Sequence, residues 1–250
     1  MEITIKELLE AGVYFGHPTR QFDPRIKPYL YGKRQGIYII DIEKTIEKIK
    51  ESGEFLKKIA SQNKKILFVG TKKQAQTVIK EIAENCKMPY VNYRWVGGTL
   101  TNFNEIRKRI ERLEEIEKLE SSGKINLYTK KEIQLLEKEK EDLKKKFEGI
   151  REMTEYPGAM VVVDVKREVN AIKEGKKLNI PIVGIVDTNG NPESVDYPIP
   201  ANDDGLKSIQ TVLLKLADYI LEGLKESGYI QGNIKEEIKN EINSEEKEKK

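Results

Sequence analysis

The chain has 250 residues, of which 45 are Lys or Arg and 42 are Asp or Glu, giving a formal net charge of +3 at pH 7. With one Cys and one His, the chain has no intramolecular disulfide or zinc site of the usual Cys/His kind, and any histidine-assisted nucleophile would have to use His17. No stretch approaches the roughly 20 consecutive apolar residues that span a bilayer, and the N-terminus lacks signal-peptide features, so we expect a cytoplasmic protein with no membrane partner.

The first 36 residues are predicted to form a short helix and then a basic arm without regular structure. Residues 3–11 carry apolar side chains at helical spacing and end at Gly12. From there to Gly36, glycine and proline recur often enough to interrupt any regular element. Five Lys or Arg residues and only one acid lie in 16–36, interleaved with Tyr and Phe. This composition is typical of a segment that neutralises phosphates and stacks on bases.

Beyond this arm, short apolar segments alternate with amphipathic ones. The strand-like segments are residues 37–42, 65–70, 89–93, 159–165, 180–186 and 197–199. The helix-like segments are residues 45–60, 74–86, 170–178 and 205–223. This alternation predicts an α/β fold: a doubly wound, flavodoxin-like parallel sheet of about five strands with helices on both faces.

A highly charged segment interrupts the α/β pattern at residues 105–152. In it, 27 of 48 residues are charged, and apolar residues recur at steps of three and four on either side of Gly123. Two such seams joined by a short connector predict an antiparallel coiled-coil hairpin. Lys140 falls on the second seam, so we expect imperfect packing there.

The patterns divide the chain into four parts. These are the helix and basic arm (1–36), a discontinuous α/β domain (37–104 and 153–228), the hairpin (105–152) and a charged tail (229–250) that we expect to be disordered. The basic residues are concentrated toward the front, since residues 1–104 hold 18 Lys or Arg and 11 Asp or Glu. Such asymmetry indicates a polyanionic partner for the basic part.

The candidate RNA-binding residues come from this basic half, although a Lys-rich run can also be an ordinary solvated surface. They are His17, Arg20, Arg25, Lys27, Tyr29, Tyr31, Lys33, Arg34, Lys72, Lys73 and Arg94.

An alternative function is a phosphate-handling enzyme that uses Asp164 and Asp187, both near strand ends, with the loop after Gly70. The Walker and GxGxxG patterns are absent, and no base or substrate clamp accompanies the two carboxylates. We therefore favour a capping role for them and expect no enzyme activity, cofactor, metal or small-molecule substrate. Cys86 lies on an apolar helix stripe and is interpreted as a core residue.

Several motifs together resemble one family, the bacterial form of the second protein of the small ribosomal subunit. They include LEAGVYFGHPTR at 9–20, YRWVGGTLTN at 93–102, GIVDTN at 184–189 and PANDD at 200–204. Further matching blocks lie at 24–32, 38–41 and 66–73. Tyr14 stands where many relatives have His, which counts against a metal site shared with His17; Phe22 replaces a common Trp and Ala201 a common Gly.

The resemblance implies a Rossmann-like domain with a protruding coiled-coil hairpin. It also implies a non-catalytic structural component of the small ribosomal subunit, located on the ribosome, bound to ribosomal RNA and required for translation. The neighbours it implies are small-subunit proteins, including the large messenger-binding protein one.

Overall fold

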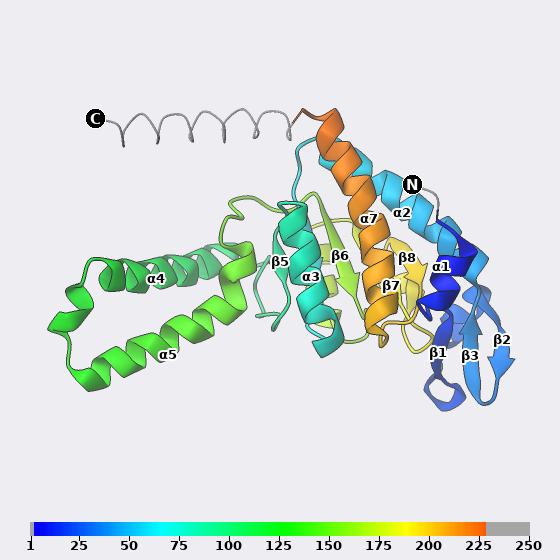
Figure 1. Cartoon of the computed structure of the whole chain (residues 1–250), viewed down its shortest axis with the longest axis horizontal. Coiled ribbons are helices and arrows are strands. Elements are labelled where there is room, and N and C mark those ends of the chain that lie inside the picture. The colour runs from blue at the N-terminus through cyan, green and yellow to red at the C-terminus, as the bar shows by residue number, and fades with distance from the viewer. Residues whose placement is uncertain (1–2, 229–250) are drawn as a thin grey trace.

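A five-stranded parallel sheet lies at the centre of the computed structural model, which describes residues 3–228 (Figure 1). Its strands are β4 (Ile66–Val69), β5 (Tyr90–Val91), β6 (Ala159–Val163), β7 (Ile182–Val186) and β8 (Tyr197–Pro200), in the order β5-β4-β6-β7-β8. All four pairings are parallel, as predicted, and the order is that of flavodoxin-like folds. The predicted tail at 229–250 lies outside the described residues.

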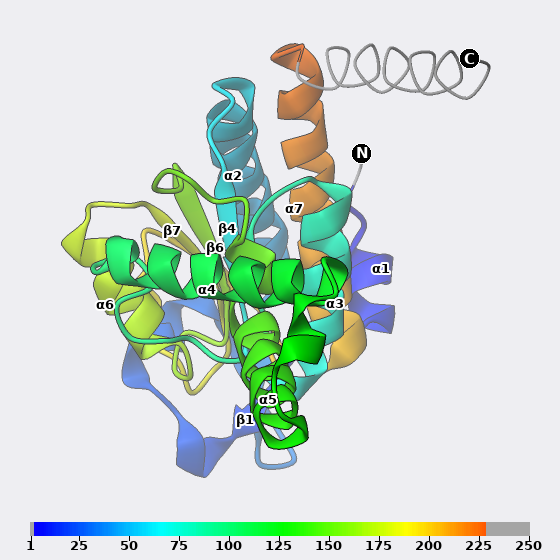
Figure 2. The same cartoon turned by 90° about the vertical axis from the view of Figure 1, so that its left-hand side faces the viewer.

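Helices cover both faces of this sheet because successive strand residues point to opposite sides. On β4, Phe68 joins the core formed with α1 (Ile5–Glu10), α2 (Ile42–Ser61), α3 (Lys73–Asn85) and α7 (Leu206–Glu226). Leu67 joins the opposite core, which α4 (Phe103–Ser121) and α6 (Val169–Lys177) cover (Figure 2). The strands are therefore buried on both faces, which explains their continuous apolar sequences.

The arm is not irregular, which corrects the prediction for residues 12–36. β1 (Phe15–Pro18), β2 (Leu30–Arg34) and β3 (Ile37–Ile40) form a separate antiparallel sheet in the order β1-β3-β2. Strand β3 was predicted correctly as a strand, but it belongs to this small sheet and not to the α/β sheet. Gln35 and Gly36, both at positive φ, make the two-residue turn between β2 and β3. Of the residues interpreted as breakers, Pro24 and Pro28 lie in a 3-10 turn and Gly36 lies in the hairpin turn, whereas Gly16 and Gly32 lie within strands β1 and β2.

Helices α4 and α5 (Lys130–Phe147) run away from the sheet side by side and contact each other (Figure 1). A capping box of Thr129 and Glu132 begins α5. Lys140, predicted on the seam, meets Glu120 of α4 at 2.7 Å, so an ion pair replaces an apolar contact there. Within residues 3–228, no helix is long and apolar enough to cross a membrane.

Candidate functional site

The small sheet brings His17 against the carboxyl edge of the large one. Its Nδ1 lies 3.1 Å from Oδ2 of Asp187, which follows β7, and its Nε2 lies 3.1 Å from Oδ2 of Asp204, which follows β8. Its backbone N–H donates to Oγ1 of Thr188 at 2.8 Å. A Cβ at Gly16 would lie 2.4 Å from the Thr188 methyl carbon, so only glycine permits this approach.

Lys72 lies between three carboxylates at the same edge. Its Nζ is 2.6 Å from Asp203 Oδ1, 2.7 Å from Asp204 Oδ1 and 3.2 Å from Asp164 Oδ2, and its side chain is only 13% exposed. Burial alone would lower the pKa of Lys72, but the charge and hydrogen bond of Asp203, with its acidic neighbours, raise it well above 10.5. We call Lys72, His17 and the acids at 164, 187, 203 and 204 the carboxylate cluster.

The two titrating groups of the carboxylate cluster both hold protons more tightly than usual. Burial, followed by the charges of Asp187 and Asp164, raises the pKa of Asp203 to about 7, even though Lys72 opposes this. The hydrogen bond to Asp187 outweighs burial and raises the pKa of His17 above 6.5. The cluster is therefore an acidic site whose protonation changes near neutral pH.

The same side chains could hold a metal ion. His17, Asp187, Asp203 and Asp204 each offer one ligand atom, and these atoms lie within 4.8 Å of one another. Carboxylates with one imidazole suit a divalent cation. Such an ion would share Asp203 and Asp204 with the Lys72 ammonium, which already neutralises part of their charge.

The pKa shifts predict that the protein becomes more stable as the pH falls from 8 to 5. Protonated His17 stabilises the fold below pH 6.5, and this contribution is lost as the pH rises through the raised pKa of His17. Asp203 has an ordinary pKa of 3.8 and a pKa of about 7 in the folded protein. Between these two pH values the folded protein binds a proton that the unfolded chain does not, so lowering the pH stabilises the fold. The free energy of unfolding from urea titrations should rise by about 1–2 kcal/mol over this range. Asp203→Asn should flatten the dependence, and an unchanged slope would contradict this assignment.

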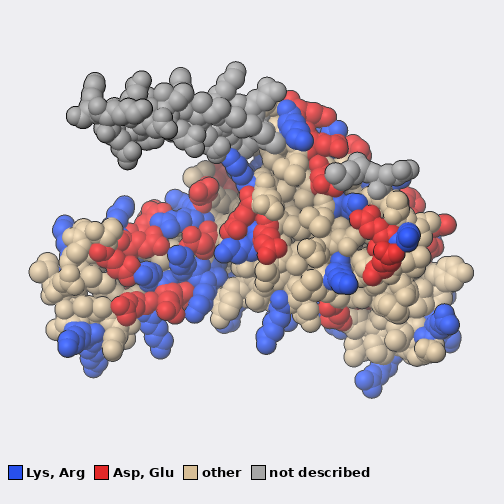
Figure 3. Space-filling view, in the orientation of Figure 1, with Lys and Arg blue, Asp and Glu red and all other residues tan. Residues whose placement is uncertain are grey.

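Most of the predicted RNA-binding residues are exposed around the small sheet. Arg20 lies in a 3-10 turn (Thr19–Gln21), Arg25 and Lys27 lie in the next one (Pro24–Tyr29), and Lys33 and Arg34 lie on β2. Lys and Arg side chains project at the corner of Figure 3 where Figure 1 places β1–β3, whereas α4 and α5 carry both charges. Beside them, Tyr31 is 81% exposed and Tyr29 is half-buried against the second core.

The remaining candidates divide between two environments. Lys73 and Arg94 are exposed beyond the carboxyl ends of β4 and β5. His17 and Lys72 belong to the carboxylate cluster, so their polar atoms face acids of the same chain. The structure thus separates a basic surface, made of Arg20, Arg25, Lys27, Lys33, Arg34, Lys73 and Arg94, from the partly buried His17 and Lys72.

Glu174 on α6 holds the loop that carries Arg94. Its carboxylate accepts hydrogen bonds from Trp95 Nε1 (2.9 Å) and from the backbone N–H groups of Gly98 (2.8 Å), Leu100 (3.0 Å) and Thr101 (3.1 Å). These hydrogen bonds outweigh burial and lower the pKa of Glu174. The loop is therefore fixed by one charged acceptor.

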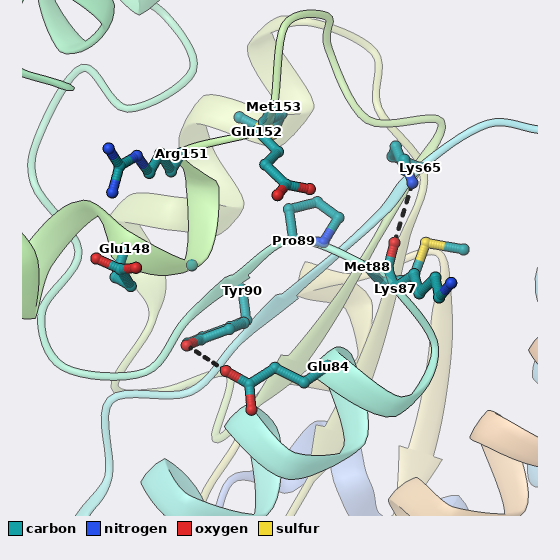
Figure 4. Close-up of a pocket in the computed structure, with 11 residues that line it drawn as sticks. Lys65, Glu84, Lys87, Met88, Pro89, Tyr90, Glu148, Arg151, Glu152 and Met153 are labelled. Atoms are coloured by element: carbon teal, nitrogen blue, oxygen red, sulfur yellow. Dashed lines mark hydrogen bonds between the residues drawn. The ribbon is translucent and has the colours of Figure 1, made fainter. Parts of the chain in front are cut away.

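A pocket of about 450 Å³ lies at the opposite, amino edge of the sheet, between the end of α3 and the base of α5 (Figure 4). Lys65 and Pro89, which precede β4 and β5, line it together with Arg151 and Glu152. Polar groups of the pocket wall hydrogen-bond to each other: the Tyr90 hydroxyl donates to Glu84 at 3.1 Å, and the Lys65 ammonium donates to a backbone carbonyl. None of the predicted site residues lines this pocket.

Sequence reasoning missed Asp203, Asp204 and Glu174 as site residues. The first two stood in the PANDD block, where adjacent acids after a strand were a usable signal. Asp164 and Asp187 do accept backbone hydrogen bonds from Arg167 and Thr188, as the capping interpretation requires, but they also bind Lys72 and His17. Glu174 carried no signal, because its partners lie more than 70 positions away.

A comparison with known families found a match over most of the chain. A family model described as ribosomal protein S2 matches residues 8–223. The match runs from α1 into α7 and so includes the small sheet, the five parallel strands and the carboxylate cluster.

Proposed function

This chain belongs to the ribosomal protein S2 family, and on that premise we propose that it binds small-subunit ribosomal RNA through its basic surface. The family assigns the protein a structural role in the small ribosomal subunit, and its members are typically non-enzymatic. The residues we assign to RNA phosphates are those of the basic surface, and Tyr31 is assigned to a sugar or base. His17 and Lys72 are left out of this assignment because carboxylates already engage them.

The observation that carries the proposal is the number of exposed cations that have no ion-pair partner within the described residues. Among the residues described, Arg20, Lys27, Lys33, Arg34 and the two basic residues beyond β4 and β5 are exposed and form no ion pair. Arg25 alone of the basic surface is paired, with Asp23. Cations without internal partners can displace the counterions condensed on a phosphate backbone, which is the main source of affinity for RNA.

The paired helices α4 and α5 supply a second contact surface in this proposal. Their charges are mixed and many are mutually paired, as in Arg112 with Glu139 and Arg151 with Glu117. A surface of this kind suits neighbouring proteins better than bare phosphate. We propose small-subunit proteins there, and the messenger-binding protein one as a neighbour of the whole chain.

The contacts within the carboxylate cluster count against the enzyme alternative. Asp164 binds the Lys72 ammonium and Asp187 binds His17, so both acids are engaged within the chain. A real nucleotide site would raise the melting temperature by mass action. Millimolar Mg²⁺-nucleotide should therefore leave the melting temperature unchanged, and a clear increase would revive the alternative.

We expect the double substitution Lys33→Ala and Arg34→Ala to weaken binding to small-subunit ribosomal RNA without altering the fold, because both side chains are exposed on β2. In titrations at several salt concentrations, the slope of log K against log salt should flatten by roughly 0.7–0.9 for each lost phosphate contact. Lys225→Ala, at the far end of α7, is the matched control and should leave the slope unchanged. Equal slopes for the double variant and the wild type would remove these residues from the interface.

A further inference from the structure

The turn that joins α4 to α5 has a defined backbone although it lies far from the sheet. Helix α4 has 19 residues, so its last residue lies roughly 27 Å from its first. Gly123, at a φ of 69°, follows α4, and a 3-10 turn (Lys124–Leu127) then leads to the capping box that begins α5. The Gly123 N–H donates to the Glu120 carbonyl at 3.0 Å, and the Asn126 N–H donates to the Gly123 carbonyl at 3.2 Å. We call residues 124–131 the hairpin tip, and its hydrogen bonds preorganise it for binding.

Apolar side chains of the hairpin tip project into solvent. Leu127 is 86% exposed, which is the largest exposed fraction of any large apolar side chain among residues 3–228. Tyr128, next to it, is 42% exposed, and Leu135 in the second turn of α5 is 60% exposed. A partner that covers these side chains gains affinity, because apolar area is removed from water.

The hairpin tip also carries an excess of positive charge. Three of its lysines are exposed and form no ion pair with any described residue: Lys124, Lys130 and Lys131. The two nearest acids are engaged within the hairpin, since Glu120 pairs with Lys140 and Glu132 accepts hydrogen bonds from Thr129. On the face shown in Figure 3, uncharged and basic side chains cover the far end of the hairpin, and acidic ones begin closer to the sheet.

We propose that the hairpin tip docks on a neighbouring small-subunit protein, in an apolar pocket that takes Leu127 and Tyr128 and has acidic side chains around it. Charge complementarity calls for the acids, because the lysines of the tip have no partners of their own and would repel a basic surface. The most exposed side chain favours a protein over RNA, since leucine has no ring to stack on a base and no hydrogen bond to offer.

This inference rests on the proposed function, which places small-subunit proteins against α4 and α5. It adds the residues that make the contact and the chemistry of the surface that receives them. A side chain that protrudes from a defined turn into a pocket concentrates binding energy in a few residues, so single substitutions can test it.

Binding of the full chain to two receptors tests the proposal. The receptors are small subunits from which this protein has been removed, and small-subunit ribosomal RNA free of protein. Leu127→Ala should weaken binding to the subunits roughly tenfold and leave binding to the bare RNA unchanged, because only the subunits carry the protein partner. Leu214→Ala is the matched control, since Leu214 is 46% exposed on α7, and it should bind both receptors like the wild type.

Charge reversal tests the acidic character of the partner. Lys130→Glu should weaken binding to the subunits, and the effect should shrink as salt is added, because salt screens exposed charges. Lys225→Glu makes the same change at an exposed position near the end of α7 and should have no effect.

A photocrosslinker identifies what the hairpin tip touches. p-Benzoylphenylalanine introduced at position 127 should give, in assembled subunits, a crosslinked product that protease removes and ribonuclease does not. Mass spectrometry should place the crosslink among acidic residues of a small-subunit protein. The same group at position 214 is the control and should not give this product.

The outcomes separate this inference from the proposed function. If Leu127→Ala binds the subunits like the wild type, the docking inference is overturned and the proposed function stands. If Leu127→Ala weakens both receptors equally, or the crosslink at position 127 is to RNA, the tip contacts RNA and the protein partner is overturned. If the wild type binds no bare ribosomal RNA, the proposed function itself fails.

Discussion

Lys72→Met should destabilise the protein by about 3–5 kcal/mol, because it removes the cation that the buried Asp203, the partly buried Asp164 and the exposed Asp204 share. Methionine matches the length of the lysine side chain, so the loss is one of charge and not of volume. Asp203, with a side chain only 3% exposed, would then be left beside Asp187 and Asp164 without its lysine partner, and His17 would be the one basic group remaining in the cluster. Urea denaturation at pH 8 measures the effect.

Acidification provides the sharpest check on this explanation. The variant should recover stability between pH 8 and 5 more steeply than the wild type, since protonating Asp203 removes the unpaired charge. Asp203→Asn in the Lys72→Met background should restore part of the loss. Lys57→Met is the control, since Lys57 pairs with Glu222 and Glu226 at the surface and its replacement should change the unfolding midpoint little. A loss at Lys72 that is independent of pH would contradict the assigned cause.

Glu174→Ala should cost about 3 kcal/mol, because it removes the charged acceptor of five hydrogen bonds from the loop at 95–101. Several backbone N–H groups would lose their partner at once. Trp95 is the only tryptophan in the chain, so its fluorescence reports directly on the loop and should shift to the red as water enters. Denaturation followed by the same fluorescence gives the stability.

The companion variants separate charge from shape. Glu174→Gln keeps the side-chain volume but puts an NH₂ group against N–H donors, so its loss should be smaller than that of the alanine variant. Glu81→Ala, at an exposed position on α3, should leave both fluorescence and stability unchanged. If the alanine variant keeps the wild-type emission maximum, Glu174 does not hold the loop.

Lys72 shows a limit of prediction from sequence. Lys72 was selected as a cation for an external phosphate, and its position after β4 was predicted correctly. Its partners come from the ends of β6 and β8, and no local pattern says which strand ends are neighbours. The cations of the basic surface were selected from the same kind of local pattern, and the structure leaves them exposed because no carboxylate from another strand end reaches most of them.

The sequence by itself determined the elements of the α/β part and the type of sheet. Buried parallel strands require continuous apolar runs, and helices packed on one side require apolar residues at steps of three and four, so both leave local periodic patterns. The helix predicted at 205–223 is α7 (Leu206–Glu226), and the strand predicted at 180–186 is β7 (Ile182–Val186).

Only the tertiary structure decided which of these elements meet. The small antiparallel sheet depends on pairings between β1, β2 and β3 that its glycines and prolines concealed, and this sheet carries His17 to Asp187, 170 positions away. Periodicity reflects the neighbours of a residue along one element, whereas a site at a sheet edge depends on strand order, which is settled by packing across the whole fold.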